Sequence, residues 1–130
     1  MIFNFAIPTP ANTPATAPLV TPLQLAAGKI SRVEVQYPLG VSALAHLTLS
    51  LGLWQIFPTN QSGSFATSNE TLGWDEDYDL DQPPWQLTAT TWNLDPNWQH
   101  TLTVRITMTE TDTDAAVLAA EIEKILTEAT

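Results

Sequence analysis

The feature that most constrains the fold of this chain is a strict alternation of apolar and polar residues. The clearest segment, 100-HTLTVRITMTE-110, has apolar residues at every second position: Leu102, Val104, Ile106 and Met108. Successive side chains of a β-strand point to opposite faces, so this segment would have one buried and one solvated face. It predicts a strand of an antiparallel sheet that covers a core on one side.

Two further segments show the same period. In 30-ISRVEVQYP-38 the apolar residues Val33, Val35 and Tyr37 alternate with polar ones. The segment 43-ALAHLTLSLGLWQIFP-58 alternates until Trp54, where the phase changes, and Gly52 is the residue at which we expect the strand to bend.

Residues typical of turns separate these segments, as in 58-PTNQSGSFATSNETLG-73 and 93-NLDPNW-98. We expect 86-QLTATTW-92 and 99-QHTLTVRITM-108 to pair as an antiparallel hairpin. The fold class predicted for residues 23–111 is an antiparallel β-sandwich, with the jelly roll as the specific type considered.

The two ends of the chain differ from this centre. Residues 1–22 are predicted to form an extended N-terminal arm, because five prolines interrupt 8-PTPANTPATAPLVTP-22 and exclude a helix or a central strand. Its apolar start is expected either to be covered by its own sheet or to dock on a neighbouring subunit, through Ile2, Phe3, Phe5 and Ile7. Removal of this arm is expected to preserve the fold.

Residues 112–130 are predicted to form one amphipathic helix, with Asp112 and Asp114 at its N-terminal end. Its apolar face either packs on the sandwich or associates with other copies through Leu118, Ile122 and Ile125.

The stretch 74-WDEDYDLDQPPW-85 has an acid at every second position: Asp75, Asp77, Asp79 and Asp81. A calcium loop of the EF-hand kind would need a glycine where Leu80 stands, and carboxylates on one strand face do not have the different environments of a catalytic pair. We interpret the stretch as a solvated edge strand, in which like charges discourage pairing with another sheet. Only Glu76 is out of place on its apolar side.

The chain has five tryptophans, and four of them lie between residues 74 and 98. They either close the ends of the core or are exposed as interface anchors or a sugar-stacking platform. The candidate ligand or interface aromatics are Trp74, Trp85, Trp92 and Trp98.

Composition excludes several functions. A net charge of −10 with only four lysines and arginines argues against a nucleic-acid partner. The absence of cysteine excludes disulfides, cysteine zinc ligands and cysteine nucleophiles.

No secretory signal and no apolar run of membrane-spanning length is found, so synthesis in a cytoplasm is expected. His46 and His100 have no ligand partner at metal-binding spacing, and no nucleophile or phosphate-loop motif occurs, so neither catalysis, nor a metal, nor a cofactor is predicted.

In this architecture the chain resembles the decoration or cement proteins of tailed-phage capsids. The segments that carry the resemblance are 1-MIFNFAIPTPANTPATAPLVTP-22, as the arm, and 85-WQLTATTWNLDPNWQHTLTVRITM-108, as the jelly-roll hairpin. It implies a structural protein of the virion that forms trimers and reinforces a capsid shell. The expected function is therefore that of a non-enzymatic assembly protein, and the alternative is a carbohydrate-binding or other ligand-binding sandwich that uses exposed tryptophans.

Overall fold

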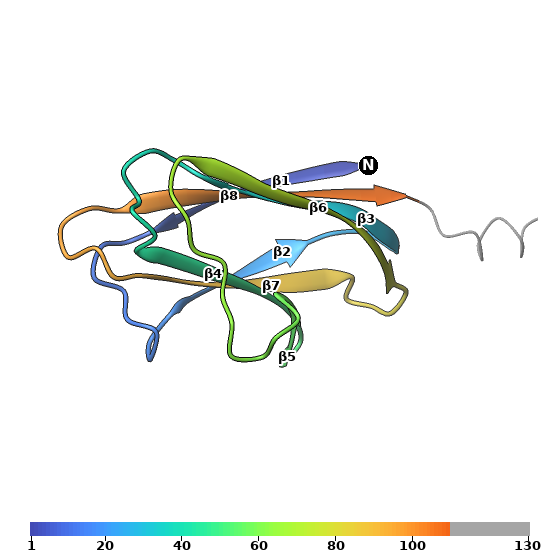
Figure 1. Ribbon diagram of the computed structural model, residues 1–130. Helices are drawn as coiled ribbons and strands as arrows, with labels where there is room; N and C mark the ends of the chain where they lie inside the picture. Colours follow the sequence, from blue (N-terminus) through green and yellow to red (C-terminus); the bar gives the residue numbers. More distant parts are fainter. Residues whose placement is uncertain (110–130) are drawn as a thin grey trace, which may run out of the picture.

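The structure, a computed structural model, describes residues 1–109 and consists of two antiparallel four-stranded sheets (Figure 1). The strands are β1 (Ile2–Thr9), β2 (Leu19–Gln24), β3 (Gly28–Tyr37), β4 (Ala45–Leu51), β5 (Trp54–Phe57), β6 (Glu70–Leu80), β7 (Gln86–Asn93) and β8 (His100–Thr109). One sheet has the order β1-β8-β3-β6 and the other has the order β2-β7-β4-β5. The predicted antiparallel β-sandwich is confirmed at this level.

The core lies between the two sheets and is built from the alternating residues. On β8 the fully buried side chains are Leu102, Val104, Ile106 and Met108, while the threonines between them face outward. The opposite sheet contributes buried Leu47 and Leu49 from β4 and Leu87 from β7. The alternation in the sequence is therefore the alternation between core and solvent.

The predicted hairpin of residues 86–92 with residues 99–108 is wrong. β7 pairs with β2 and β4, and β8 pairs with β1 and β3, so consecutive strands lie in different sheets. Both strands have an apolar face that must reach the core, and the six residues 94–99 between them are enough for the chain to cross from one sheet to the other.

Residues 1–22 are not an arm separate from the sandwich. They contain β1, which pairs with β8 from Ile2 to Thr9, and most of β2, which pairs with β7. Pro8 and Pro22 are accommodated because β1 and β2 are edge strands, in which one side of the backbone needs no hydrogen-bond partner.

The four apolar side chains predicted to dock on a neighbouring subunit are partly used within the domain. Phe3 and Phe5 pack against the core of their own domain, and Ile7 is buried in it. Among residues 1–109 Phe3 and Phe5 are half-buried, and Ile2 is 69% exposed. The sequence left open whether these side chains pack on their own sheet or on a neighbouring subunit, and in the structure Phe3, Phe5 and Ile7 pack on their own domain.

The acidic stretch is an edge strand, as predicted. Among residues 1–109, β6 lies at the edge of its sheet and pairs only with β3. Asp75, Asp77 and Asp79 are exposed, whereas Trp74, Glu76 and Tyr78 form a half-buried row on the opposite face. At Gly52 the structure has a turn between two separate strands, β4 and β5, which pair with each other, instead of the bend expected within one strand, and Gly52 has a φ of 59° there.

The predicted helix of residues 112–130, with Leu118, Ile122 and Ile125, lies outside the described residues. Residues 1–109 contain no helix that is long and apolar enough to cross a membrane.

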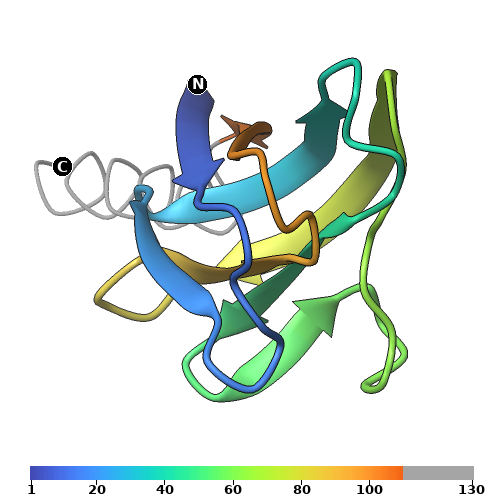
Figure 2. The same ribbon diagram turned by 90° about the vertical axis from the view of Figure 1, so that its left-hand side faces the viewer.

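The loops after β1, β3 and β7 emerge at the same end of the sandwich, because antiparallel strands turn there, and the segment after β5 reaches this end with its last residues. We call this the loop end, and it comprises residues 10–18, 38–44, 65–69 and 94–99. The loops after β1, β3 and β7 lie on the left in Figure 1 and face the viewer in Figure 2.

Candidate docking site at the loop end

Charged side chains are distributed unequally between the two sheets. Within residues 1–109, all of them except Asp81 and Asp95 lie on β3, β6 or β8, which belong to the same sheet. We call β1-β8-β3-β6 the charged sheet and β2-β7-β4-β5 the uncharged sheet. The strands of the uncharged sheet have no Asp, Glu, Lys or Arg at all.

The loop end shares this lack of charge. Its four loops contain a single ionisable carboxylate, Asp95, which is buried. The remaining residues are Pro, Ala, Thr, Asn, Ser, Gln and Gly with a few apolar residues. A surface without exposed charge is unusual on an acidic protein, and depletion of charged residues is characteristic of the centre of a protein interface.

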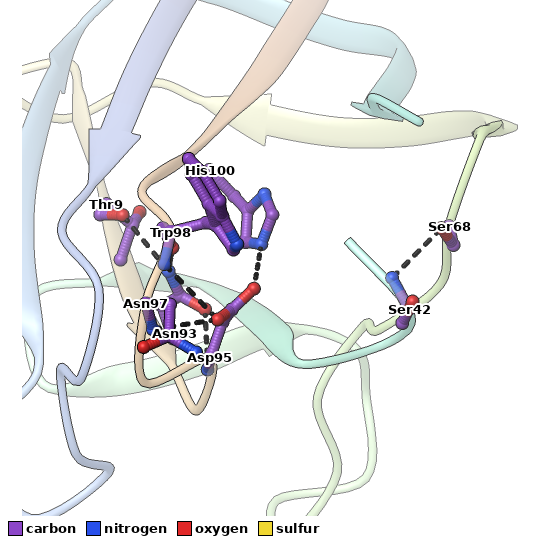
Figure 3. Close-up of polar contacts among 8 residues, drawn as sticks. All are labelled: Thr9, Ser42, Ser68, Asn93, Asp95, Asn97, Trp98 and His100. Atoms are coloured by element: carbon purple, nitrogen blue, oxygen red, sulfur yellow. Dashed lines mark hydrogen bonds and ion pairs between the residues drawn. The ribbon is translucent and has the colours of Figure 1, made fainter. Parts of the chain in front are cut away.

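Asp95 organises the turn between β7 and β8 (Figure 3). Its Oδ1 accepts hydrogen bonds from the backbone N–H groups of Asn97, at 2.9 Å, and Trp98, at 3.2 Å. Its Oδ2 lies 2.8 Å from Nε2 of the buried His100. Each carboxylate oxygen therefore has a partner, which offsets the cost of burying the group.

The electrostatics of Asp95 follow from these contacts. The backbone hydrogen bond from Asn97 and the side-chain hydrogen bond from His100 hold the pKa of the Asp95 carboxyl below its ordinary value. Asp95 is consequently ionised at neutral pH, and it can accept all three hydrogen bonds at once.

Asn93 fixes the other side of the same turn. Its Nδ2 donates to the carbonyl oxygens of Trp98, at 2.8 Å, and Thr9, at 3.3 Å. Its Oδ1 accepts from the backbone N–H of Asp95 at 3.0 Å. Both polar groups of Trp98's backbone are thus bound by the turn, so the position of this residue is fixed by buried neighbours.

Hydrogen bonds also join the loops of this end to one another. The backbone of Asn12 donates to the carbonyl of Asp95 at 2.7 Å, and the backbone of Leu94 donates to Leu44 at 2.9 Å. The backbone N–H of Ser42 donates to Oγ of Ser68 at 3.0 Å. The loops after β1, β3, β5 and β7 are therefore one connected assembly rather than four independent segments.

Large apolar side chains project from this assembly. Trp98 is 69% exposed, Leu39 in the β3–β4 loop is 79% exposed, and Leu94 is 51% exposed. An exposed ring on a backbone held by buried hydrogen bonds loses little conformational entropy when it binds. The arrangement suits contact with another protein surface.

The other candidate tryptophans occupy different places. Trp74 and Trp85 are half-buried and pack against the core, and Trp74 lies 5.0 Å from the ring of Phe65. Trp92 faces outward on the uncharged sheet, where its ring stacks on His46 at 5.2 Å. The four rings that the sequence singled out are not brought together, and two of them serve the core.

The most exposed tryptophans are Trp98 and Trp54, which is 67% exposed. They lie at opposite ends of β4, because Ala45 pairs with Asn93 beside the loop end and Leu51 pairs with Trp54 at the far end. They do not form the row of rings that a sugar platform would need.

Sequence reasoning identified Trp98 but not the residues that hold it. The Asn-Asp-Pro run indicated a turn, and an Asp that starts a turn usually bonds to backbone amides two and three residues later. His100 lies near the start of the predicted strand of residues 99–108, and nothing in its spacing shows that it reaches Asp95. No group of His, Asp and Glu suited to a metal ion occurs in residues 1–109.

Comparison of the chain with protein-family models, with curated proteins and with solved structures finds no match.

Proposed function

We propose that this chain is a non-enzymatic assembly protein of jelly-roll type, which self-associates through its loop end and reinforces a larger shell, as a virion decoration protein does. A trimer in the virion is the expected form, made in the host cytoplasm. The observation that carries the proposal is the rigidly held, exposed Trp98 in a loop end without exposed charge.

The strand order supports the jelly-roll assignment. A jelly roll has eight strands in two packed sheets, and the chain passes back and forth between the sheets. Here all consecutive strands except β4 and β5 lie in different sheets, and all pairs are antiparallel. Viral capsid proteins are among the proteins that use this arrangement.

Charge supports a second copy of the chain as the partner. With a net charge of −10, two copies repel each other wherever their acidic surfaces meet. The four loops bring no exposed charged side chain to such a contact, and the exposed carboxylate that borders them, Glu70 at the start of β6, accepts a hydrogen bond from Oγ1 of Thr67 at 2.6 Å. Three apolar side chains, Leu39, Leu94 and Trp98, are available there, and tryptophan is enriched among the residues that dominate binding energy.

The proposal is tested with the substitution Trp98→Ser, measured by sedimentation equilibrium at tens of micromolar protein. The unsubstituted protein is expected to have the mass of an oligomer, and the variant that of a monomer with an unchanged circular dichroism spectrum. Trp54→Ser is the matched control, because Trp54 is equally exposed at the opposite end and its loss should leave the mass unchanged. A monomeric unsubstituted protein, or equal masses for both variants, would contradict the proposal.

A further inference from the structure

A groove lies between β5 and β6, on the side of the molecule where the two sheets meet. It encloses about 320 Å³ and is lined by Trp54, Gln55, Phe57, Gln61, Glu76 and Tyr78 among others. Aromatic and amide groups thus surround a single carboxylate. None of these residues belongs to the Trp98 turn.

Glu76 is the residue that breaks the pattern of β6. It stands in the half-buried row between Trp74 and Tyr78, where the alternation calls for an apolar side chain. Both flanking rings pack edge-on against Phe57, at 5.5 Å for Trp74 and 6.0 Å for Tyr78. A carboxylate placed in an aromatic row costs stability, and departures of this kind concentrate at functional sites.

The hydrogen bonds of Glu76 fix its orientation without neutralising its charge. Its Oε1 accepts from the indole Nε1–H of Trp74 at 2.9 Å, and its Oε2 accepts from the backbone N–H of Asp77 at 3.4 Å. Neighbouring Asp75 pairs with Arg32 at 3.0 Å, and Asp77 pairs with Lys29 at 2.8 Å, on the outer face. Within residues 1–109 Glu76 has no such cationic partner.

The rim of the groove is also held in place. Nε2 of Gln55 donates to the carbonyl oxygens of Pro58, at 2.9 Å, and Gly63, at 3.2 Å. Nε2 of Gln61 donates to the carbonyl oxygen of Gln55 at 2.9 Å. The segment that follows β5 is therefore tied to the strand, so this side of the groove is formed before a ligand binds, while the ring of Trp54 is 67% exposed.

We propose that this groove binds an alkylammonium group, either the end of a methylated lysine side chain or a free choline-like amine. The carboxylate of Glu76 would face the positive charge, and the rings of Trp54 and Tyr78 would contact its alkyl groups. Ring faces attract cations, and the attraction increases when the cation leaves water. The negative charge of the whole protein raises the local concentration of cations further.

The test uses isothermal titration calorimetry of the full chain with choline and with N-acetyl trimethyllysine methylamide. The neutral control is 3,3-dimethylbutan-1-ol, which has the shape of choline without its charge. Both cations are expected to bind in the millimolar range, and the one that binds more tightly identifies the source of the group. The alcohol should bind at least about tenfold more weakly if charge contributes a free energy typical of a cation–π contact.

Glu76→Gln is the decisive variant, because glutamine keeps the size of the side chain and an acceptor for Trp74 while it removes the charge. It should weaken choline binding by about tenfold, which corresponds to 1.4 kcal/mol. Asp79→Asn removes the same charge from the exposed face of the same strand and should leave binding unchanged.

Three results would overturn this inference: no heat with either cation, equal affinity for the alcohol, or equal losses in the two variants. Binding of the neutral disaccharide cellobiose more tightly than of choline would also overturn it, in favour of a sugar site. Trp98→Ser separates the two proposals, because it should abolish self-association and leave choline binding intact.

Discussion

The charged and uncharged sheets cover the same core but present different surfaces. Each sheet contributes fully buried strand residues, such as Val35 and Ile106 on one side and Leu47 and Leu87 on the other. Outside the core, β3, β6 and β8 carry nearly all the charge of residues 1–109, whereas the strands of the other sheet carry none. The fold therefore requires only the inward alternation, and the outward positions are free to serve another purpose.

On the charged sheet the outward side chains form a continuous series of ion pairs. Glu34 lies 2.8 Å from Arg105 on one side and 3.0 Å from Arg32 on the other, and Arg32 also pairs with Asp75. Gly73 leaves room for this series, since a Cβ at that position would lie 2.6 Å from Nη2 of Arg32. The exposed acids of β6 beside it keep this edge from pairing with another sheet.

On the uncharged sheet the outward residues are mostly hydroxyl and amide side chains, such as Thr88, Thr90, Ser50 and Gln86. Exceptions are the exposed apolar residues Val20 and Trp54 and the stacked pair of His46 and Trp92, in which Nδ1 of His46 lies 2.9 Å from Oγ of Ser64. A surface of this kind stays hydrated without creating a field that repels other acidic copies. Combined with the loop end, it makes half of the molecule compatible with self-association.

The largest expected effect on folding comes from removing the edge strands β1 and β2, one from each sheet. A chain that starts at Leu23 lacks β1 and most of β2, so it exposes the strands β8 and β7 that they cover. It is expected not to fold, with the circular dichroism spectrum of an unfolded chain and no cooperative thermal transition. A folded truncated protein would show instead that residues 1–22 are dispensable.

Shortening one buried leucine on each sheet should reduce the stability of the fold by a similar amount. Leu47→Ala on the uncharged sheet and Leu102→Ala on the charged sheet each remove a fully buried side chain. Both are expected to lower the free energy of unfolding by about 2 to 5 kcal/mol. Urea denaturation measures this quantity, and a loss confined to one of the two variants would show that one sheet dominates the core.

The stability that the turn between β7 and β8 gives to the fold should depend on pH. The pKa of Asp95 is lower in the folded protein than in the unfolded chain, where it is about 3.9. Its ionised form therefore stabilises the fold above that value, and this stability is lost as the pH falls through the folded pKa. Asp95→Asn should lower the melting temperature at pH 7 by less than the core truncations, and the difference from the unsubstituted protein should shrink in acid. A constant difference between pH 7 and pH 2 would contradict this assignment.

The ion pairs of the charged sheet should contribute less. Glu34→Gln removes the carboxylate that joins Arg32 to Arg105 and is expected to cost up to about 1 kcal/mol at low ionic strength. The loss should decrease in salt, because exposed charges are screened. Thr88→Ala on the uncharged sheet is the control, and its effect should not change with salt. Equal salt dependence in both variants would remove the electrostatic distinction between the sheets.

The smallest expected effect comes from His46, the titratable residue on the outer face of the uncharged sheet. Burial lowers the pKa of His46 below its ordinary value, so the unfolded chain binds the proton first. The stability that this provides is present above pH of about 6.5 and is lost as the pH falls through the folded pKa. His46→Gln should flatten the melting temperature between pH 7 and pH 5, and an unchanged slope would indicate that His46 is solvated in the fold.

Much of the fold could be predicted because it depends on local alternation. The strands around Val33 to Tyr37 and Leu102 to Met108 have the register that their apolar residues dictate, and the acidic edge strand follows from the same period. A strand whose apolar residues are two apart has only one way to face a core, whatever its neighbours are. The change in the phase of the alternation near Gly52 indicated an interruption of the strand, but the sequence suggested a bend where the structure has a turn between two paired strands.

Pairing partners and the candidate sites were decided by the tertiary structure. The alternation of β1, β7 and β8 fixes which side chains point inward, but it contains no information on which strands lie beside one another. Consequently the sequence suggested a hairpin of β7 with β8 and a separate arm at residues 1–22, whereas burial of every apolar face at once requires strands that alternate between two sheets. The same packing brings His100 to Asp95 and places Glu76 and Trp54 on the lining of one groove. The alternation of apolar and polar residues can be detected from residues that are close in the sequence. These arrangements bring together residues from distant strands, so they exist only after those strands have packed.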